Sequence, residues 1–188
     1  MAERAKFGES LSFRAKALTQ LTNSIGVYAL CDLDHVPIYI GQSTDGIRAR
    51  VRRHLTSARS DVIANRQIDV WEIASVKAWP VGSPDQITAL ENGLFHHFHV
   101  QSPLMNGAVL ATDAEFQYSE CEQTVLVLSE GEIARRREPE ARLPRQIQHY
   151  LRLVDHFLNV KSSKEMAIAL DVHFTRLKKY HEQFLDVV

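Results

Sequence analysis

The chain has few cysteines and no long apolar run, and both absences narrow the kinds of protein that it can be. Cys31 and Cys121 are its two cysteines among 188 residues, too few for the disulfide framework of a small secreted domain. No stretch approaches the roughly 20 apolar residues that span a bilayer. The first residues, Met1–Lys6, lack the apolar core of a signal peptide. We therefore expect a cytoplasmic protein with no membrane contact.

Neither sign of charge is in clear excess. The 22 basic and 23 acidic residues give a formal net charge of −1, which argues mildly against nucleic-acid binding. Distribution matters more than the total. Basic residues crowd segments 48–59, 135–145 and 176–179, whereas acidic residues gather in 113–132. Each basic segment could contact phosphates, although a solvated surface of salt bridges is the commoner interpretation of any one of them.

A β-hairpin is predicted near the start of the chain. The apolar runs 27–31 and 36–40 flank the turn-forming residues 32–35. Because side chains alternate along a strand, Tyr28 and Tyr39 each face away from their aliphatic neighbours. Two phenols on one face of a hairpin suggest the floor of a site.

A short helix with two functional candidates is predicted next. Arg50 and His54 are four residues apart, so they share one helix face. Arg48 is a rival of Arg50, and the choice between them depends on the family resemblance given below. In that family the loop before the helix varies in length and an arginine lies one turn before a basic-His pair, which favours Arg50 with Arg53–His54.

A third strand and a second helix are predicted downstream. Segment 70–79 is rich in apolar residues and ends at a proline, which favours a strand. Segment 86–99 has an apolar stripe at helical spacing, and Glu91 lies beside that stripe. A carboxylate so close to an apolar face is unusual unless it is paired or binds a cation. Asn106 follows in the loop after the helix.

In this order, the elements resemble the motif of the GIY-YIG nuclease family. The matching residues are Gly26-Val27-Tyr28, Tyr39-Ile40-Gly41, Arg50 with His54, Glu91 and Asn106, with Val27 where isoleucine is usual. The resemblance covers about residues 25–108. It implies an α/β (α+β) fold with a small mixed or antiparallel three-stranded sheet flanked by helices, forming a catalytic domain over 25–110.

The resemblance also implies roles in phosphodiester hydrolysis. Glu91 would bind one divalent cation, Mg²⁺ with Mn²⁺ as a substitute, which would stabilise the phosphate charge and the leaving oxygen. Arg50 would hold the non-bridging oxygens bidentately. Asn106 would brace the site, and Gly41 would let the phosphate approach the backbone closely.

The identity of the general base stays open between two residues. The family resemblance favours Tyr28, with Tyr39 positioning the substrate. A free tyrosine has a pKa of about 10, so this role needs nearby positive charge. His54 is the rival base, because an ordinary histidine pKa lies near neutrality.

The two ends of the chain fall outside the resemblance. Segment 1–24 is expected to be a helix or an arm, and 111–188 a mostly helical region with a strand or helix start at 124–128. Segment 162–181 resembles a helix-turn-helix, and an ordinary helical hairpin also fits it. With Arg48 and Arg53, the DNA contacts predicted from it are His173, Thr175, Arg176 and Lys179.

We therefore expect a metal-dependent DNA endonuclease, with sequence-specific restriction-type cleavage as the first choice. A structure-selective nuclease of repair or recombination is the second. Two alternatives belong to other functional classes: a catalytically inactive DNA-binding module, and a metal-binding protein that uses His96, His97 and His99. Cutting both DNA strands needs two active sites or successive nicks, so a homodimer or higher oligomer is a candidate assembly.

Overall fold

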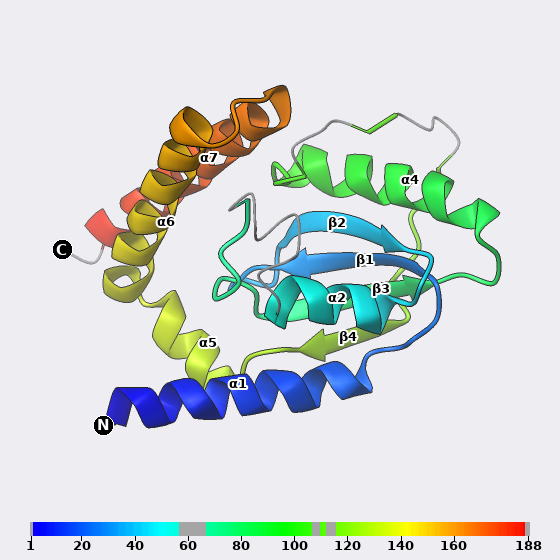
Figure 1. Ribbon diagram of the computed structural model, residues 1–188, viewed down its shortest axis with the longest axis horizontal. Coiled ribbons are helices and arrows are strands. Elements are labelled where there is room, and N and C mark those ends of the chain that lie inside the picture. Colours follow the sequence, from blue (N-terminus) through cyan, green and yellow to red (C-terminus); the bar gives the residue numbers. More distant parts are fainter. Residues whose placement is uncertain (1, 57–66, 107–109, 112–115, 187–188) are drawn as a thin grey trace.

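The computed structural model describes residues 2–56, 67–106, 110–111 and 116–186, with side chains from residue 8 onward (Figure 1). The predicted helix or arm at the start of the chain is a helix. In chain order the elements are α1 (Ala2–Gln20), β1 (Gly26–Cys31), β2 (Pro37–Ser43), α2 (Ile47–Thr56), β3 (Ser75–Pro80), α4 (Asp85–Gln101), β4 (Gln123–Leu126), α5 (Glu130–Arg137), α6 (Pro139–Asn159) and α7 (Lys164–Leu185).

The predicted α+β architecture is confirmed, with one more strand in the sheet than expected. Four antiparallel strands lie in the order β2-β1-β3-β4, so β2 and β4 are the edges. The fourth strand, Gln123–Leu126, overlaps the apolar run at 124–128 and pairs with β3 from Ser75↔Leu126 to Ala78↔Gln123. The predicted division of the chain near residue 110 stays a prediction, although β4 from beyond it joins this sheet.

The third strand is shorter than the prediction for 70–79. It begins only at Ser75, because the preceding residues form a turn in which the backbone NH of Glu72 bonds to the carbonyl of Asp69. Apolar content alone could not reveal this turn, since Trp71 and Ile73 pack into clusters as strand residues would.

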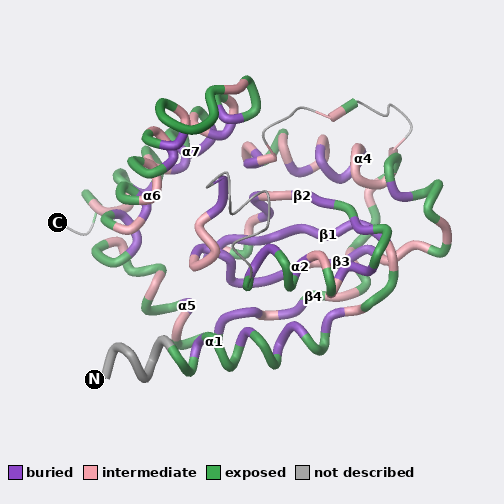
Figure 2. The backbone as a smooth tube through the Cα atoms, in the orientation of Figure 1, coloured by how far each residue is buried: buried purple, intermediate pink, exposed green. Residues whose placement is uncertain are grey.

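Helices cover both faces of the sheet. One face, with Tyr28, Leu30 and Val76, packs against residues of α1 and α2. The other face, with Val27, Ala29 and Trp79, packs against the apolar stripe of α4. Figure 2 shows the resulting buried strands between largely exposed outer helix surfaces. The alternation of side chains along β1 therefore decides which residues belong to which layer.

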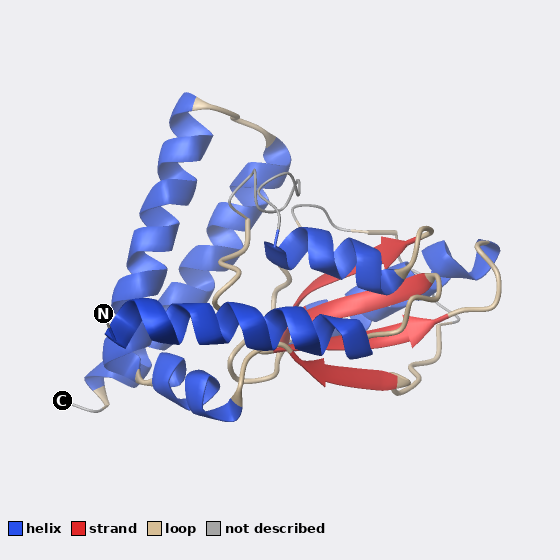
Figure 3. Cartoon of the chain, turned by 60° about the horizontal axis from the view of Figure 1, so that its bottom comes forward, coloured by secondary structure: helices blue, strands red, loops and turns tan. Residues whose placement is uncertain are grey.

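The helix-turn-helix predicted at 162–181 is wrong. Residues 164–185 form the single uninterrupted helix α7, antiparallel to α6 in the hairpin at one end of the molecule (Figure 3). The buried positions Met166, Ala169, Val172 and Arg176 recur every three or four residues straight through the expected turn. Asp171 stands where such a turn often has glycine, and it leaves the helix unbroken.

Candidate active site

The hairpin brings both tyrosines to one face of the sheet, as predicted. Tyr28 lies opposite Gly41, and Leu30 lies opposite Tyr39, so the two phenols are diagonal neighbours. Their ring centroids are 6.4 Å apart. Tyr28 is fully buried, whereas Tyr39 is partly exposed. The partly exposed ring is therefore the one that an arriving substrate would meet first.

Gly41 makes room for these rings. A Cβ added at this position would lie 2.5 Å from the Tyr28 hydroxyl and 2.8 Å from a ring carbon of Tyr39. The structure thus gives Gly41 a packing role, whereas its predicted role, close approach of the phosphate to the backbone, stays a prediction. The space above the glycine is filled by the two tyrosines, which could not pack so closely over any larger residue.

His54 completes a triangle of rings. It lies in the last turn of α2, on the helix face that Ile47, Val51 and Leu55 bury. Its ring centroid is 5.9 Å from Tyr28 and 5.8 Å from Tyr39. The Tyr28 hydroxyl and His54 Nε2 are 2.6 Å apart, so a ring protonated on Nδ1 accepts the phenol proton. The two rival general bases of the sequence are thus joined by one short hydrogen bond.

Arg50 lies one helical turn before His54 and acts on Tyr28. Burial raises the pKa of Tyr28 well above 10, and the charge of Tyr39 raises it further, whereas the charge and hydrogen bonding of Arg50 lower it. Arg50 Nε is buried and has no hydrogen-bond partner among the described residues. Such an atom is a donor in need of an acceptor, which an anionic ligand would supply.

Arg48, the alternative to Arg50, makes a structural contact instead. Arg48 Nε donates to the carbonyl of Leu21 at 2.6 Å, which fastens α2 to the end of α1. Arg53 is exposed on α2 and could contact solvent or a ligand. The structure therefore supports Arg50 over Arg48 as the arginine beside the tyrosines.

Glu91 comes from the middle of α4, close to Ile87 and Phe95 on the face that packs on the sheet. Burial raises the pKa of its carboxyl group to about 7. Among the described residues no ion pair offsets this desolvation. Its charge also raises the pKa of Tyr28, which places Glu91 within electrostatic reach of the tyrosines. A desolvated carboxylate without a cation is a suitable ligand for one.

The donor set fits a magnesium ion rather than a zinc ion. In the described part of the chain, no three His, Cys, Asp or Glu side chains gather as a metal cluster. Mg²⁺ keeps several waters and is often held by one or two carboxylates together with substrate phosphates. Glu91 can supply the single carboxylate that such an ion needs.

Asn106 holds the strand that carries Tyr39. Its side-chain amide pairs with both backbone groups of Ile40, accepting from the NH at 3.0 Å and donating to the carbonyl at 2.6 Å. Because β2 is an edge strand, this amide satisfies groups that no neighbouring strand pairs. We name Tyr28, Tyr39, Arg50, His54, Glu91 and Asn106 the tyrosine site.

Two of the four DNA contacts predicted on α7 are wrong as surface positions. His173 and Arg176 are buried, and burial lowers the pKa of His173 to about 4. Thr175 is exposed, and its hydroxyl bonds to the carbonyl of Asp171 within the helix. Lys179 is exposed and lies 3.8 Å from Asp34. Because His173 and Arg176 face the protein, the four residues cannot enter a groove of DNA together.

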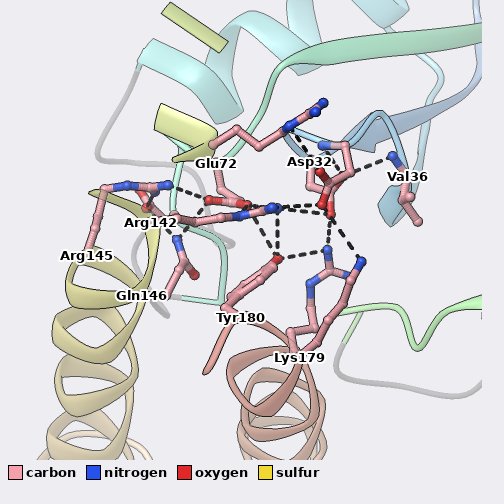
Figure 4. Close-up of polar contacts among 12 residues, drawn as sticks. Asp32, Val36, Glu72, Arg142, Arg145, Gln146, Lys179 and Tyr180 are labelled. Atoms are coloured by element: carbon pink, nitrogen blue, oxygen red, sulfur yellow. Dashed lines mark hydrogen bonds and ion pairs between the residues drawn. The ribbon is translucent and has the colours of Figure 1, made fainter. Parts of the chain in front are cut away.

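Arg176 instead belongs to a buried network that sequence reasoning missed. Figure 4 shows the network around Glu72, Arg142 and Tyr180. We name it the arginine network. It joins α6 and α7 to the loops at one end of the sheet. Its members are Asp32, Asp34, Asp69, Glu72, Arg142, Arg145, Gln146, Arg176 and Tyr180.

Arg142 is the centre of the network. Its Nε is 2.8 Å and its Nη2 is 2.5 Å from the same oxygen of Glu72, while its Nη1 donates to Asp34 at 2.7 Å. Its guanidinium also lies 4.0 Å above the ring of Tyr180. Burial lowers the pKa of Arg142, but Glu72, Tyr180 and Asp34 raise it by more.

The sequence contained the charged residues of this network, but their pattern was ambiguous. Arg142 and Arg145 lie in a basic segment for which we weighed phosphate contacts against a solvated surface of salt bridges, the commoner interpretation. Asp32 and Asp34 lie in a segment that we interpreted as a turn. Asp32 does hold that turn, because its Oδ1 accepts from the NH groups of Asp34 and Val36 at 2.9 Å. A buried face of α6 that carries Arg142 and Gln146 would have been the clue.

The three histidines of α4 lie in separate environments. His96 bonds to the carbonyl of Leu110, His97 stacks on Tyr118 at 4.0 Å, and His99 Nδ1 accepts from the NH of Leu104. They form no shared metal site among the described residues. Nothing here supports the metal-binding alternative built on them.

Comparison of the chain with known protein families, curated proteins and solved structures finds no match in any of the three. Across the described residues, no helix combines the length and the apolarity needed to cross a bilayer.

Proposed function

We propose that the protein is a metal-dependent endonuclease that hydrolyses phosphodiester bonds of DNA. One observation carries the proposal: the fold brings Tyr28, Tyr39 and His54 from three separate elements into contact, as the resemblance implies. Tyr28 and Tyr39 come from adjacent strands, His54 from α2 within hydrogen-bond distance of Tyr28, and Glu91 from α4 within electrostatic reach. The resemblance to the GIY-YIG family supplies the reaction for this arrangement.

The Tyr28–His54 pair is the candidate for removing a proton from the attacking water. In the free protein Tyr28 stays protonated, because its pKa is well above 10. It can act on water only if its own proton moves away, and His54 Nε2 at 2.6 Å is the acceptor in line for it. Tyr39, the partly exposed phenol, would orient the water and the phosphate.

Arg50 and Glu91 would handle the negative charge of the phosphate. Arg50 has a buried nitrogen without a partner among the described residues, and a non-bridging phosphate oxygen would satisfy it. Glu91 would hold Mg²⁺, which when bound neutralises charge on the phosphate and on the leaving oxygen. Asn106 keeps the backbone beside Tyr39 in place by its two bonds to Ile40.

Sequence-specific restriction-type cleavage is our preferred form of this activity, and structure-selective cleavage is the second. The observation against a module that only binds DNA is that Glu91 stays desolvated without a cationic partner among the described residues. Such a carboxylate lowers stability and would impede DNA binding by repulsion. A binding module gains nothing from keeping it.

The test is cleavage of plasmid and phage DNA by the purified protein, with Mg²⁺ and with EDTA. Discrete metal-dependent bands indicate a sequence-specific enzyme, whereas nicking or cutting only at branched DNA indicates a structure-selective one. Glu91→Ala should lose cleavage and keep DNA binding. Tyr28→Phe should slow cleavage about 10²- to 10⁴-fold, the usual contribution of general base catalysis.

Two outcomes would contradict the proposal. Full activity of Glu91→Ala would remove the metal assignment. DNA shifted on a gel without any cleavage, under all metal conditions, would leave only a binding module. Tyr150→Phe, which removes a hydroxyl from a half-buried tyrosine on α6, is the matched control and should cleave like the unmodified protein.

A further inference from the structure

Helix α6 carries large apolar side chains on its outer face. Ile147, Leu151 and Leu158 are 49%, 66% and 71% exposed, and Phe174 of the neighbouring α7 is 57% exposed. Tyr150 joins the two helices of this face, since its ring centroid is 6.1 Å from that of Phe174. A monomeric protein seldom leaves so many large apolar groups together in water.

The positions of these side chains have a definite period. Ile147, Leu151, Val154 and Leu158 are separated by four, three and four residues, the spacing of a coiled-coil seam. The opposite face of α6 already packs in the molecule, with Gln146, Leu153 and His156 buried. The exposed stripe is therefore a second face of α6, separate from the one that packs in the molecule, and a large apolar stripe of this kind is normally covered.

We propose that this seam is the interface of a homodimer, in which α6 of one copy packs antiparallel against α6 of a second copy. An apolar seam with this spacing packs against a helix with the same spacing, and α6 of a second copy of the chain is such a helix. A two-fold axis between Arg152 and Leu153 pairs Ile147 with Leu158 and Leu151 with Val154 of the other copy. Each pair then joins aliphatic groups of similar size, as a self-complementary two-fold interface requires.

The polar residues beside the seam suit this pairing. On a helical wheel Gln148 and Asp155 flank the same edge of the stripe. The antiparallel arrangement places Asp155 of one copy beside Gln148 of the other, so an amide can donate to a carboxylate. No like charges meet along that edge.

The size of the surface is also appropriate. The exposed apolar groups with half-buried Tyr150 and Val154 form a patch on the order of several hundred Å², and a standard interface buries about 800 Å² on each partner. The rim of α6 and α7 can supply the remainder. The inference rests on this surface and does not require the proposed activity, although a dimer would bring two tyrosine sites into one particle for cutting both strands.

Sedimentation velocity of the protein without DNA or metal tests the proposal. The unmodified protein is expected to sediment at twice the chain mass of 21.4 kDa at micromolar concentration. The variant with Leu151→Lys and Leu158→Lys should raise the dimer dissociation constant at least about 100-fold, because burying charges on an apolar seam is costly. Its circular dichroism spectrum should stay unchanged, since both side chains are exposed in the single chain.

Val100→Lys is the matched control. Val100 is an apolar residue that is even more exposed, 86% accessible, but it lies on α4 and not on the seam. This variant should remain dimeric. A monomeric unmodified protein up to about 100 µM, or equal dissociation of both variants, would overturn the proposal. Because Glu91→Ala should dimerise normally, loss of the dimer and loss of the nuclease activity are distinguishable outcomes.

Cross-linking tests the orientation of the two helices. In a Cys121→Ser background, the double variant Ile147→Cys with Leu158→Cys should form an intermolecular disulfide on oxidation. Ile147→Cys alone should not, because antiparallel helices hold the two copies of residue 147 far apart. Efficient cross-linking of the single variant would show a parallel pair and overturn the antiparallel arrangement.

Discussion

The tyrosine site and the arginine network are both polar clusters held by the same sheet, yet their charges are arranged in opposite ways. In the arginine network every carboxylate has an arginine partner, as Glu72 has in Arg142 and Arg145. In the tyrosine site Glu91 has no ion pair among the described residues, and Arg50 keeps a buried nitrogen without an acceptor there.

This difference indicates that the arginine network has a structural role and that the tyrosine site has a functional one. Paired charges that bridge distant segments hold α6 and α7 to the end of the sheet, and every carboxylate among them is already neutralised, although Arg176 Nε, like Arg50 Nε, is buried without a hydrogen-bond partner among the described residues. Partly buried charges without an ion-pair partner raise the free energy of the unliganded protein, and binding of a ligand with the opposite charge lowers it. Stability measurements can therefore distinguish the two clusters, because the expected effects have opposite signs.

The largest effect is expected from breaking the arginine network. Arg142→Ala leaves Glu72 and Asp34 without their nearest cation, and removing one partner of a buried ion pair typically costs about 3–5 kcal/mol. Urea denaturation should show this loss in the free energy of unfolding. Arg152→Ala, at an exposed position of the same helix, should change stability by less than about 0.5 kcal/mol. Equal effects of the two substitutions would show that the network does not fasten the hairpin.

A smaller loss is expected at the brace of the tyrosine site. Asn106→Ala removes both side-chain bonds to Ile40, which should cost about 1–2 kcal/mol. The effect should be local to the edge strand, so hydrogen exchange of the Ile40 amide should accelerate about tenfold. Asn159→Ala, at the exposed end of α6, serves as the control. Unchanged exchange at Ile40 would mean that the amide does not hold this strand.

The smallest effect should be a gain in stability. Burial raises the pKa of Glu91 to about 7, so above that pH the folded protein carries a charge that the unfolded chain carries at less cost. Without divalent metal, Glu91→Gln should therefore stabilise the protein at pH 8 by roughly 1 kcal/mol, a value discounted for the exposed part of the group. At pH 4, where the carboxyl is neutral in both states, the gain should vanish.

Thermal unfolding at the two pH values checks this prediction. Glu130→Gln, at an exposed position in the first turn of α5, is the control and should give no such pH-dependent gain. A loss of stability in Glu91→Gln at pH 8 would show that Glu91 is paired in the metal-free protein.

Much of the tyrosine site was predictable because its residues follow local periods. The hairpin puts Tyr28 and Tyr39 on one face by alternation along two adjacent strands, and the spacing of Arg50 and His54 puts both on one face of α2. The short bond between Tyr28 and His54 was not predictable. It depends on how closely α2 packs on the sheet and on the room that Gly41 leaves.

The arginine network could not be predicted from local patterns. Arg142 and Glu72 are 70 residues apart in the chain, and Arg176 and Asp32 are 144 apart. The same long-range packing explains why the interpretation of 162–181 failed. The positively charged residues of this segment suggested a surface for DNA, but Arg176 points into the protein, where it forms an ion pair with the buried Asp32.

The sequence by itself determined the hairpin with its two phenols and the helix faces that carry Arg50, His54 and Glu91, and its resemblance to a family implied the α+β class. The hairpin and the helix faces follow from periods of two and 3.6 residues, which act over a few neighbours. Only the tertiary structure decided that a fourth strand joins the sheet, that α7 runs unbroken, and which arginines are partners and which remain available. Charge pairing depends on distances across the whole fold, and burial sets the free-energy cost of each unpaired charge.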